Sequence, residues 1–279
     1  GVALLRAAAK NSAVTVIVDP EDYQKIGNFS EQERKKLAAK AYRHTALYDA
    51  AIAQWMEPDA DQAVRVYQKE IGLKYGCNPH QKAAGIYSVN DADLFFETLN
   101  GSLGYINVLD AIGSWNLVKE VDEALHELCF ASFKHTSPAG VALAGKLSDS
   151  INYFYNLDNG TELSDCSCAF LRARNGDPKS SFGDFLACSR KVDVQTAELI
   201  KKHVSDGIIA PDFEPEALEI LKKKKKGAFI ILKAKENSET QNYEFREIGG
   251  LALMQKANNH RVTKKSLCTV VTDKQVLTQ

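Results

Sequence analysis

Short apolar runs and amphipathic stretches alternate along the second half of this chain. The apolar runs are rich in Ile, Phe and Ala, and the stretches between them repeat their apolar residues at helical spacing. A strand with an apolar face must bury that face, and helices between successive strands cover a sheet. The alternation therefore predicts an α/β layered fold, with strands at 128–133, 206–211 and 228–234 and helices at 107–125, 193–204 and 214–227.

The predicted helices carry local signals of their own. Asp193 is placed as an N-cap, and the helix at 214–227 ends in lysines and a Gly, the favoured charge and cap at a C-terminus. In the helix at 107–125 the apolar periodicity falls on four residues, which we expect to face the core: Leu109, Ile112, Leu117 and Val118.

The first part of the chain predicts a separate set of elements. Residues 4–11 are rich in strong helix formers, and the β-branched run within 13–23 predicts a strand that ends at a Pro turn. Residues 30–56 predict a long helix, with Ser30 and Glu33 spaced as a capping box. Its apolar stripe is Leu37, Ala41, Ala46, Leu47 and Ala51.

A polar, Pro-containing stretch at 57–62 suggests a domain boundary between there and about Gly72. We divide the chain into 1–66 and 67–279. Residues 73–81 then predict a structured loop, because they are rich in Tyr, Gly, Asn and Pro. The chain opens without Met in a helix already under way and ends after a strand-like run, so we expect a piece of a longer protein.

The charge balance and the cysteines exclude several classes of protein. The chain has 35 Lys and Arg against 36 Asp and Glu, which gives no global attraction to nucleic acid or to an acidic membrane. No apolar run reaches the ~18 residues of a membrane-spanning helix, and no signal segment precedes the first helix. Six irregularly spaced cysteines, with Cys166 and Cys168 too close for a zinc knuckle, indicate reduced thiols in a cytosolic protein.

Five consecutive lysines, Lys222–Lys226, allow two interpretations. A nucleic-acid patch is one, but the run closes a predicted helix beside a Gly in a neutral protein. Lysines at a helix C-terminus complement the helix dipole, so we favour a solvated helix end.

Lys134 and His135 stand side by side where the predicted strand at 128–133 ends. Neighbouring side chains on a strand point to opposite sides, so both can reach one site only if the chain turns there. We assign that turn to Ser137-Pro138-Ala139-Gly140, at the carboxyl end of a strand where α/β folds bind ligands. Burial beside a second base disfavours a lysine's ammonium form, and such a pair can move a proton. The alternative is a surface lysine beside a core histidine.

Three other stretches have the composition of a binding loop. One offers Lys74, Tyr75, Asn78 and His80, a second has Gly101 and Gly104 around a turn, and a third sets Gly183 and Asp184 between aromatic residues. Each alone is more typical of an ordinary turn.

Together these stretches closely resemble a family, the bifunctional purine-biosynthesis proteins that join AICAR transformylase to IMP cyclohydrolase. The resemblance covers essentially the whole chain, in order: "KYGCNPHQ", "LNGSLGYINVLDAIGSWNLVKE", "ASFKHTSPAG", "SSFGDF" and "VSDGIIAP". It implies that the chain is an internal fragment, with the C-terminal part of the cyclohydrolase domain followed by the N-terminal half of the transformylase domain. It also implies a methylglyoxal-synthase-like domain followed by a cytidine-deaminase-like α/β/α unit.

In that family the transformylase moves a formyl group from 10-formyltetrahydrofolate to the 5-amino group of AICAR. The resemblance places the catalytic pair on Lys134 and His135. It places substrate contacts on Lys74, Tyr75, Ile106, Asn107, Gly183 and Asp206, and a remnant of the cyclohydrolase site on Lys10.

The chain departs from the family at three polar positions. Lys74 stands where an Arg is usual and lacks its bidentate fork, so we expect weaker phosphate binding. Ala257 also replaces an Arg, and Lys274 aligns with an Asn thought to stabilise the transition state. The resemblance further implies that the complete protein is a cytosolic homodimer, and zinc is not expected because the deaminase ligands are absent. Because the family's transformylase sites lie at the dimer interface and use residues of the other half of that domain, we expect this fragment alone to be inactive in both reactions. The alternative is a truncated, inactive relative that serves only as a nucleotide-binding or dimerisation module.

Overall fold

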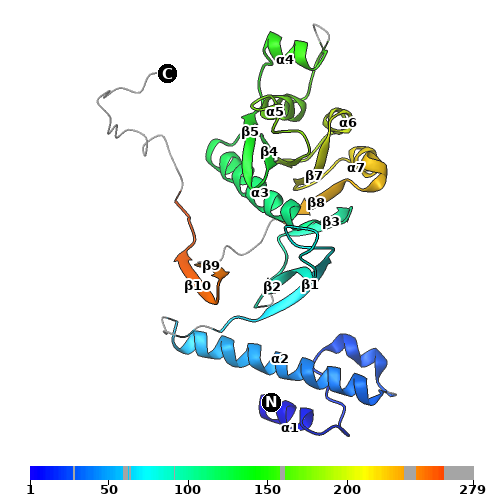
Figure 1. The fold of residues 1–279 in the computed structure, drawn as a ribbon, viewed down its shortest axis with the longest axis vertical. Helices are drawn as coiled ribbons and strands as arrows, with labels where there is room; N and C mark the ends of the chain where they lie inside the picture. Colours follow the sequence, from blue (N-terminus) through cyan, green and yellow to red (C-terminus); the bar gives the residue numbers. More distant parts are fainter. Residues whose placement is uncertain are drawn as a thin grey trace, which may run out of the picture. The chain divides into compact units, whose positions relative to one another are not determined.

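The computed structural model describes residues 1–27, 29–58, 62, 64–90, 92–157, 161–235 and 243–260. These residues form two compact units. The first comprises 1–70 and 87–92, and the second comprises 71–86 and the chain from 93 onward. Two strands at the boundary, β1 (Tyr67–Leu73) and β2 (Ala84–Val89), form a two-stranded sheet of their own, and the predicted loop at 73–81 is confirmed between them (Figure 1).

Two helices dominate the first unit, α1 (Val2–Ala9) and α2 (Glu31–Met56). The predicted capping box is confirmed: the Ser30 hydroxyl accepts the Glu33 backbone N–H at 3.3 Å, and the Glu33 carboxylate accepts the Ser30 N–H at 2.8 Å. Leu37 and Ala41 are buried as predicted. The second half of the predicted stripe is wrong, because Ala46 and Ala51 are exposed.

The strand predicted within 13–23 is wrong. Residues before Pro20 pair with no strand among the described residues, and a short 3₁₀ helix, η1 (Pro20–Lys25), follows. The Asp19 carboxylate caps this helix by accepting the Glu21 N–H at 3.0 Å, and the Lys40 ammonium lies 2.5 Å from the same carboxylate. A β-branched run becomes a strand only when a neighbouring strand takes its backbone hydrogen bonds.

A six-stranded sheet forms the centre of the second unit, in the order β3-β8-β7-β6-β4-β5. Strands β6, β7 and β8 are parallel, whereas β3 pairs with β8, and β4 with both β6 and β5, in the antiparallel sense. The bounds are β3 (Phe96–Asn100), β4 (Cys129–Lys134), β5 (Ser137–Leu143), β6 (Asp184–Cys188), β7 (Ser205–Ala210) and β8 (Ile230–Ala234).

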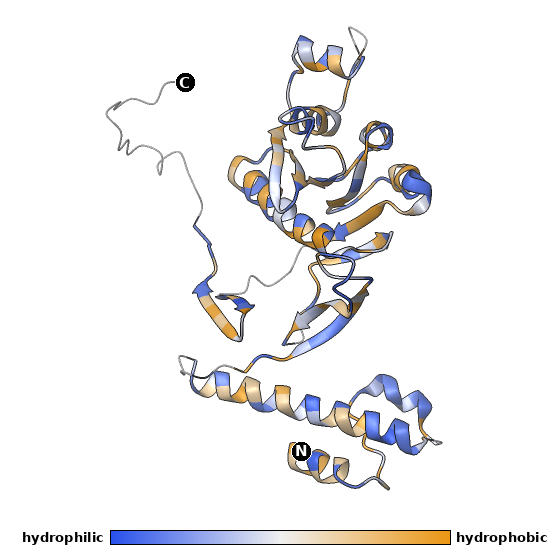
Figure 2. Cartoon of the chain, in the orientation of Figure 1, coloured by the Kyte–Doolittle hydropathy of each residue, from blue (hydrophilic) through white to orange (hydrophobic). Residues whose placement is uncertain are grey.

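Helices cover both faces of this sheet, which confirms the predicted α/β layered fold. Alternate residues of each strand enter different cores: Phe130 of β4 packs with the α5–α7 side, and Ala131 packs with α3. In Figure 2 the surrounding helices show alternating hydrophobic and hydrophilic bands. The helices are α3 (Tyr105–Leu125), α4 (Asp149–Phe154), α5 (Asp165–Arg174), α6 (Val194–Lys202), α7 (Pro215–Lys222) and η2 (Lys224–Gly227). A separate hairpin joins β9 (Tyr243–Ile248) to β10 (Leu251–Lys256).

Two details of the predicted helices need correction. In α3, Val118 is buried as predicted, but Leu109 and Ile112 are exposed, and the buried face instead carries small and polar residues beside Trp115. The helix predicted at 214–227 ends at Lys222, because Lys225 and Lys226 adopt left-handed backbone angles that a helix cannot continue.

The turn assigned to residues 137–140 is also wrong. The chain turns at His135–Thr136, and Ser137 to Gly140 already belong to β5, opposite β4. Gly140 has a packing role, since a Cβ there would lie 1.9 Å from the Ala173 carbonyl oxygen of α5. Glycine is needed at this position because two backbones approach closely.

Gly140→Ala is expected to destabilise the chain by about 1–3 kcal/mol, because β5 and α5 must move apart to admit the methyl group. Urea unfolding followed by circular dichroism measures the loss. Ser137→Ala, an exposed change on the same strand, is the control and should stay within about 0.5 kcal/mol of the unchanged chain. Equal stability of the two variants would contradict the close approach.

Candidate functional site

The predicted pair Lys134–His135 lies at a tight hairpin. Lys134 is the last residue of β4, and the two turn residues both have positive φ, 53° at His135 and 65° at Thr136. Positive φ at both central residues is the pattern of a type I′ turn, whose twist matches that of the flanking strands. Lys134 is half-buried and His135 is exposed, so neither base is enclosed as the sequence suggested.

The hairpin end lies beside the amino ends of the parallel strands. Because β4 is antiparallel to β6, with Phe133 opposite Phe185, the end of β4 meets the start of β6. The Lys134 ammonium donates a hydrogen bond to the Phe182 carbonyl oxygen and lies 3.6 Å from where a Cβ of Gly183 would stand. The pair thus stands at the carboxyl end of its own strand, as expected, and this end faces the amino ends of the parallel strands β6 and β7.

Asp206, at the start of β7, lies in the same region. Its carboxylate is 2.6 Å from the Lys225 ammonium, and its charge raises the pKa of Asp110, the buried carboxyl group that accepts the Thr136 N–H. Lys225 comes from the five-lysine run, where it is exposed. The structure thus brings together Lys134, His135, Gly183 and Asp206, four of the predicted site residues.

The lysine run is only partly the solvated helix end that we favoured. Lys224 is 8% exposed, its ammonium donates to the His203 carbonyl oxygen, and it lies 5.3 Å from the centre of the Phe229 ring. Burial, reinforced by the Arg174 charge, lowers the pKa of Lys224 to about 8. Within the run, Lys224 is therefore packed in the core and Lys225 contacts Asp206, whereas Lys223 and Lys226 are exposed.

A buried charged network supports the amino ends of β6 and β7. The Arg174 Nε lies 3.1 Å from Oδ2 of Asp184, which also accepts the Ser132 hydroxyl at 2.6 Å. Oδ1 of Asp184 and the hydroxyl of Ser205 have no hydrogen-bond partner among the described residues. Burial raises the pKa of Asp184 to about 6, against the opposing effect of Arg174.

The other predicted substrate contacts lie on α3 and in the loop between β1 and β2. Ile106 and Asn107 lie in the first turn of α3, half-buried, after the N-cap Gly104. Lys74 and Tyr75 are exposed in the loop between β1 and β2, and no described contact joins them to the hairpin.

The remaining positions that the sequence singled out are Lys10, Ala257 and Lys274. Lys10 is exposed at the C-terminus of α1, in the first unit. Ala257 follows β10, and Lys274 lies outside the described residues.

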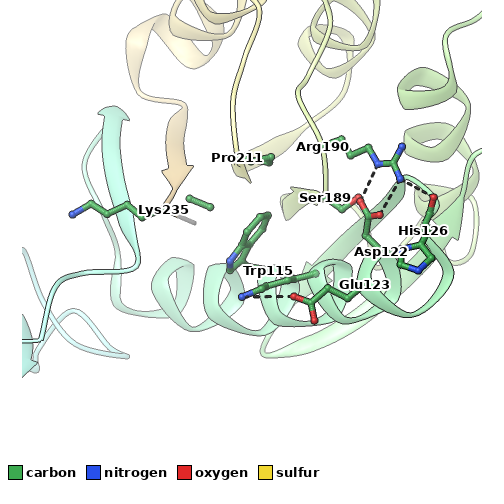
Figure 3. A pocket seen from close by; sticks show the side chains of 10 residues that line it. Trp115, Asp122, Glu123, His126, Ser189, Arg190, Pro211 and Lys235 are labelled. Carbon is green, nitrogen blue, oxygen red and sulfur yellow. Dashed lines mark hydrogen bonds and ion pairs between the residues drawn. The ribbon is translucent and has the colours of Figure 1, made fainter. Parts of the chain in front are cut away.

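A cavity of about 610 Å³ opens at the opposite end of the sheet (Figure 3). Ser189, Pro211 and Lys235 line it just beyond the carboxyl ends of β6, β7 and β8. Trp115 and Arg190 also line the cavity, and Figure 3 labels both. This is where parallel α/β sheets commonly bind ligands, yet none of the predicted site residues lines it.

In the described part of the chain, no group of three or more His, Cys, Asp or Glu side chains is placed to hold a metal ion. The five cysteines described are free. None of the described helices combines the length and apolarity needed to cross a bilayer.

Sequence reasoning missed three residues that build this region: Asp110, Arg174 and Lys225. Each forms a hydrogen bond with a residue at least ten positions away in the sequence, so no local spacing pattern predicts it. The signal that could have found Asp110 is a charge at a helix position adjoining the core-facing stripe.

The sequence model of the AICARFT/IMPCHase bienzyme family matches residues 8–279. Relatives called "Bifunctional purine biosynthesis protein PurH" occur in Thermoanaerobacter sp. (strain X514), 37% identical over 98% of this chain and 52% of the relative, and in Chloroflexus aurantiacus, 37% identical over 93% and 48%. That of Halalkalibacterium halodurans is 34% identical over 93% of this chain and 50% of the relative. The chain spans about half the length of the curated relatives it matches.

Proposed function

Because this chain belongs to the AICARFT/IMPCHase bienzyme family, we propose that it carries the proton-transfer residues of AICAR formylation. The reaction transfers a formyl group from 10-formyltetrahydrofolate to the 5-amino group of AICAR, within a protein that also closes the ring to IMP. The observation that supports this most is the convergence of Lys134, His135, Gly183 and Asp206 at one edge of the sheet.

The chemistry explains why two bases are useful there. The AICAR amine is conjugated with the imidazole ring and its carboxamide, so it is a weak nucleophile that must lose a proton as it attacks the formyl carbon. The bond from that carbon to the folate nitrogen breaks, and this nitrogen gains a proton. In our proposal His135 takes the proton from the amine, and Lys134 orients the formyl group or supplies a proton near it.

Asp206 is proposed to bind the AICAR nucleotide. One of its carboxylate oxygens is occupied by Lys225, which fixes the orientation of the carboxylate and leaves the second oxygen for a ligand donor. Gly183, at φ 74°, allows the backbone to lie close to Lys134 without a side chain between them. Ile106, Asn107, Tyr75 and Lys74 complete the proposed substrate contacts.

The wider assignments follow from the same family membership. We place the end of a methylglyoxal-synthase-like cyclohydrolase domain in 1–66, with Lys10 as its remnant, and the first half of a cytidine-deaminase-like transformylase domain in 67–279. The folate cosubstrate, a homodimer and a cytosolic compartment belong to the proposal. Free cysteines at the five described positions are consistent with that compartment.

AICAR binding tests the nucleotide site. Titration calorimetry should show that Asp206→Ala weakens binding about 10- to 100-fold, the cost of losing a charged hydrogen bond. Asp212→Ala is the matched control, because Asp212 also pairs with a lysine, Lys233 at 2.9 Å, but at the other end of β7. Equal affinity of both variants and the unchanged chain would remove Asp206 from the site.

A formyl-transfer assay with 10-formyltetrahydrofolate, run on the complete protein, then separates the two candidate functions. Binding together with transfer supports the enzyme. Binding without transfer supports the alternative, a truncated relative that acts only as a nucleotide-binding or dimerisation module. Absence of both would overturn the proposed function for this chain.

A further inference from the structure

A buried carboxylate holds the turn that carries His135. Asp110 lies in α3, is 5% exposed, and accepts the backbone N–H of Thr136 through Oδ1 at 2.6 Å. The residues are 26 positions apart in sequence, so the contact ties α3 to the β4–β5 hairpin.

This turn needs support from outside. A left-handed backbone is unfavourable for any residue except Gly, and especially for a β-branched one, yet Thr136 has φ 65° and His135 has φ 53°. Such positions cost of order 1–3 kcal/mol each and persist only where the surroundings hold them. The Thr136 hydroxyl donates to the His135 carbonyl oxygen at 2.6 Å, but this bond is internal to the turn. Asp110 supplies the hydrogen bond that comes from another element.

A neutral acceptor would serve as well if support were the whole role. Burial raises the pKa of Asp110 above its ordinary value, opposed by the hydrogen bond from Thr136 and by the charge of His135, while Asp206 raises it further. The other charges of this region are Lys134 and Lys225, which contact the Phe182 carbonyl and Asp206 respectively. A buried carboxylate that binds the His135–Thr136 turn, and on which the charge of His135 acts, therefore suggests a use for the charge itself.

We propose that Asp110 is a positioning residue that fixes the His135–Thr136 turn and places a negative charge toward the His135 imidazole. When His135 takes a proton from the amine, the carboxylate stabilises the imidazolium and itself stays unprotonated. The catalytic part of this inference rests on the proposed function, whereas the positioning part does not.

Nuclear magnetic resonance of the labelled chain tests the positioning without any turnover. The Thr136 amide proton should move as Asp110 titrates, with a midpoint above 3.8, the ordinary value for aspartate, and the His135 ring signal should show an inflection at the same pH. Both effects should vanish in Asp110→Asn. They should persist in Glu120→Gln, which makes the same charge change on an exposed position of α3. A Thr136 amide or a His135 ring that ignores Asp110 would overturn the proposal.

Kinetics of the complete protein tests the catalytic part. Asp110→Asn keeps an acceptor for Thr136 and should lower kcat for formyl transfer about tenfold, while Asp110→Ala should lower it further, within the 10²–10⁴-fold worth of acid–base catalysis. KM for AICAR should change little, because Asp110 acts through His135. Urea unfolding at neutral pH should show Asp110→Asn as stable as the unchanged chain. A complete protein without transfer would contradict the proposed function, and the Thr136 amide would still decide whether Asp110 holds the turn.

Discussion

In the complete protein, replacing His135 with alanine is expected to reduce kcat/KM for formyl transfer by about 100- to 10,000-fold. This range is the rate enhancement that a general base usually provides, and it applies here because the amine must lose a proton as it attacks. The side chain is exposed at the hairpin tip, so its removal leaves no cavity in the core. The folded state should therefore be unaffected while the reaction is lost.

A transfer assay and a urea unfolding curve, measured together, check this expectation. His44→Ala is the matched control, because His44 is an exposed histidine on α2 in the first unit. It should keep full activity and full stability. Near-normal turnover of His135→Ala would show that His135 is not the base, even if AICAR still binds.

Arg174→Met should destabilise the chain by about 3–5 kcal/mol, the cost of leaving a buried charge without its partner. The Arg174 side chain is 6% exposed and that of Asp184 is fully buried. Arg174 also donates to the carbonyl oxygens of Ser181 and of Val204, the latter at 3.1 Å, so its loss affects the amino ends of β6 and β7 together.

The loss should depend on pH in a defined direction. The folded-state pKa of Asp184, about 6, lies above its unfolded value of 3.8, so the folded chain binds more protons between these values and loses stability as pH rises through them. Without the lowering effect of Arg174 that pKa rises further. The difference in unfolding free energy between Arg174→Met and the unchanged chain should therefore be small in acid and largest above neutral pH.

The matched control for this experiment is Arg190→Met. Arg190 also pairs with an aspartate, Asp122 at 3.0 Å, but its side chain is 49% exposed. Exposed ion pairs contribute about 0–1 kcal/mol, so this change should cost little at any pH. Equal losses for Arg174→Met and Arg190→Met would contradict the role assigned to the buried network.

The sequence predicted those elements that are determined by residues close together in the chain. The capping box of α2, the buried strand β4 and the Asp193 cap of α6 were readable because each depends on residues a few positions apart. The strand predicted within 13–23 was wrong because pairing depends on a neighbouring strand. The turn was placed two residues late because His135 and Thr136 adopt angles that their residue types disfavour.

The candidate site divides in the same way. Lys134 and His135 stood out because their chemistry is unusual at a strand end. Asp110 and Lys225 did not, since a charged residue on a helix or in a lysine run looks like surface until the fold brings it to a partner. The candidate site lies at the amino ends of β6 and β7 because β4 pairs with β6 in the antiparallel sense. The strand patterns of the sequence do not reveal this pairing.

The hairpin that carries the proposed base also forms a border of the sheet. Among the strands of the described residues, β5 pairs with β4 alone, so its outer side is a sheet edge, whose backbone groups can recruit a strand of another molecule. Pro138 removes one backbone donor from this strand, and a register shift falls beside it, between Ser132 and Phe133. Proline and irregular pairing discourage edge-to-edge aggregation, so the hairpin that carries the proposed base also protects the sheet from unwanted growth.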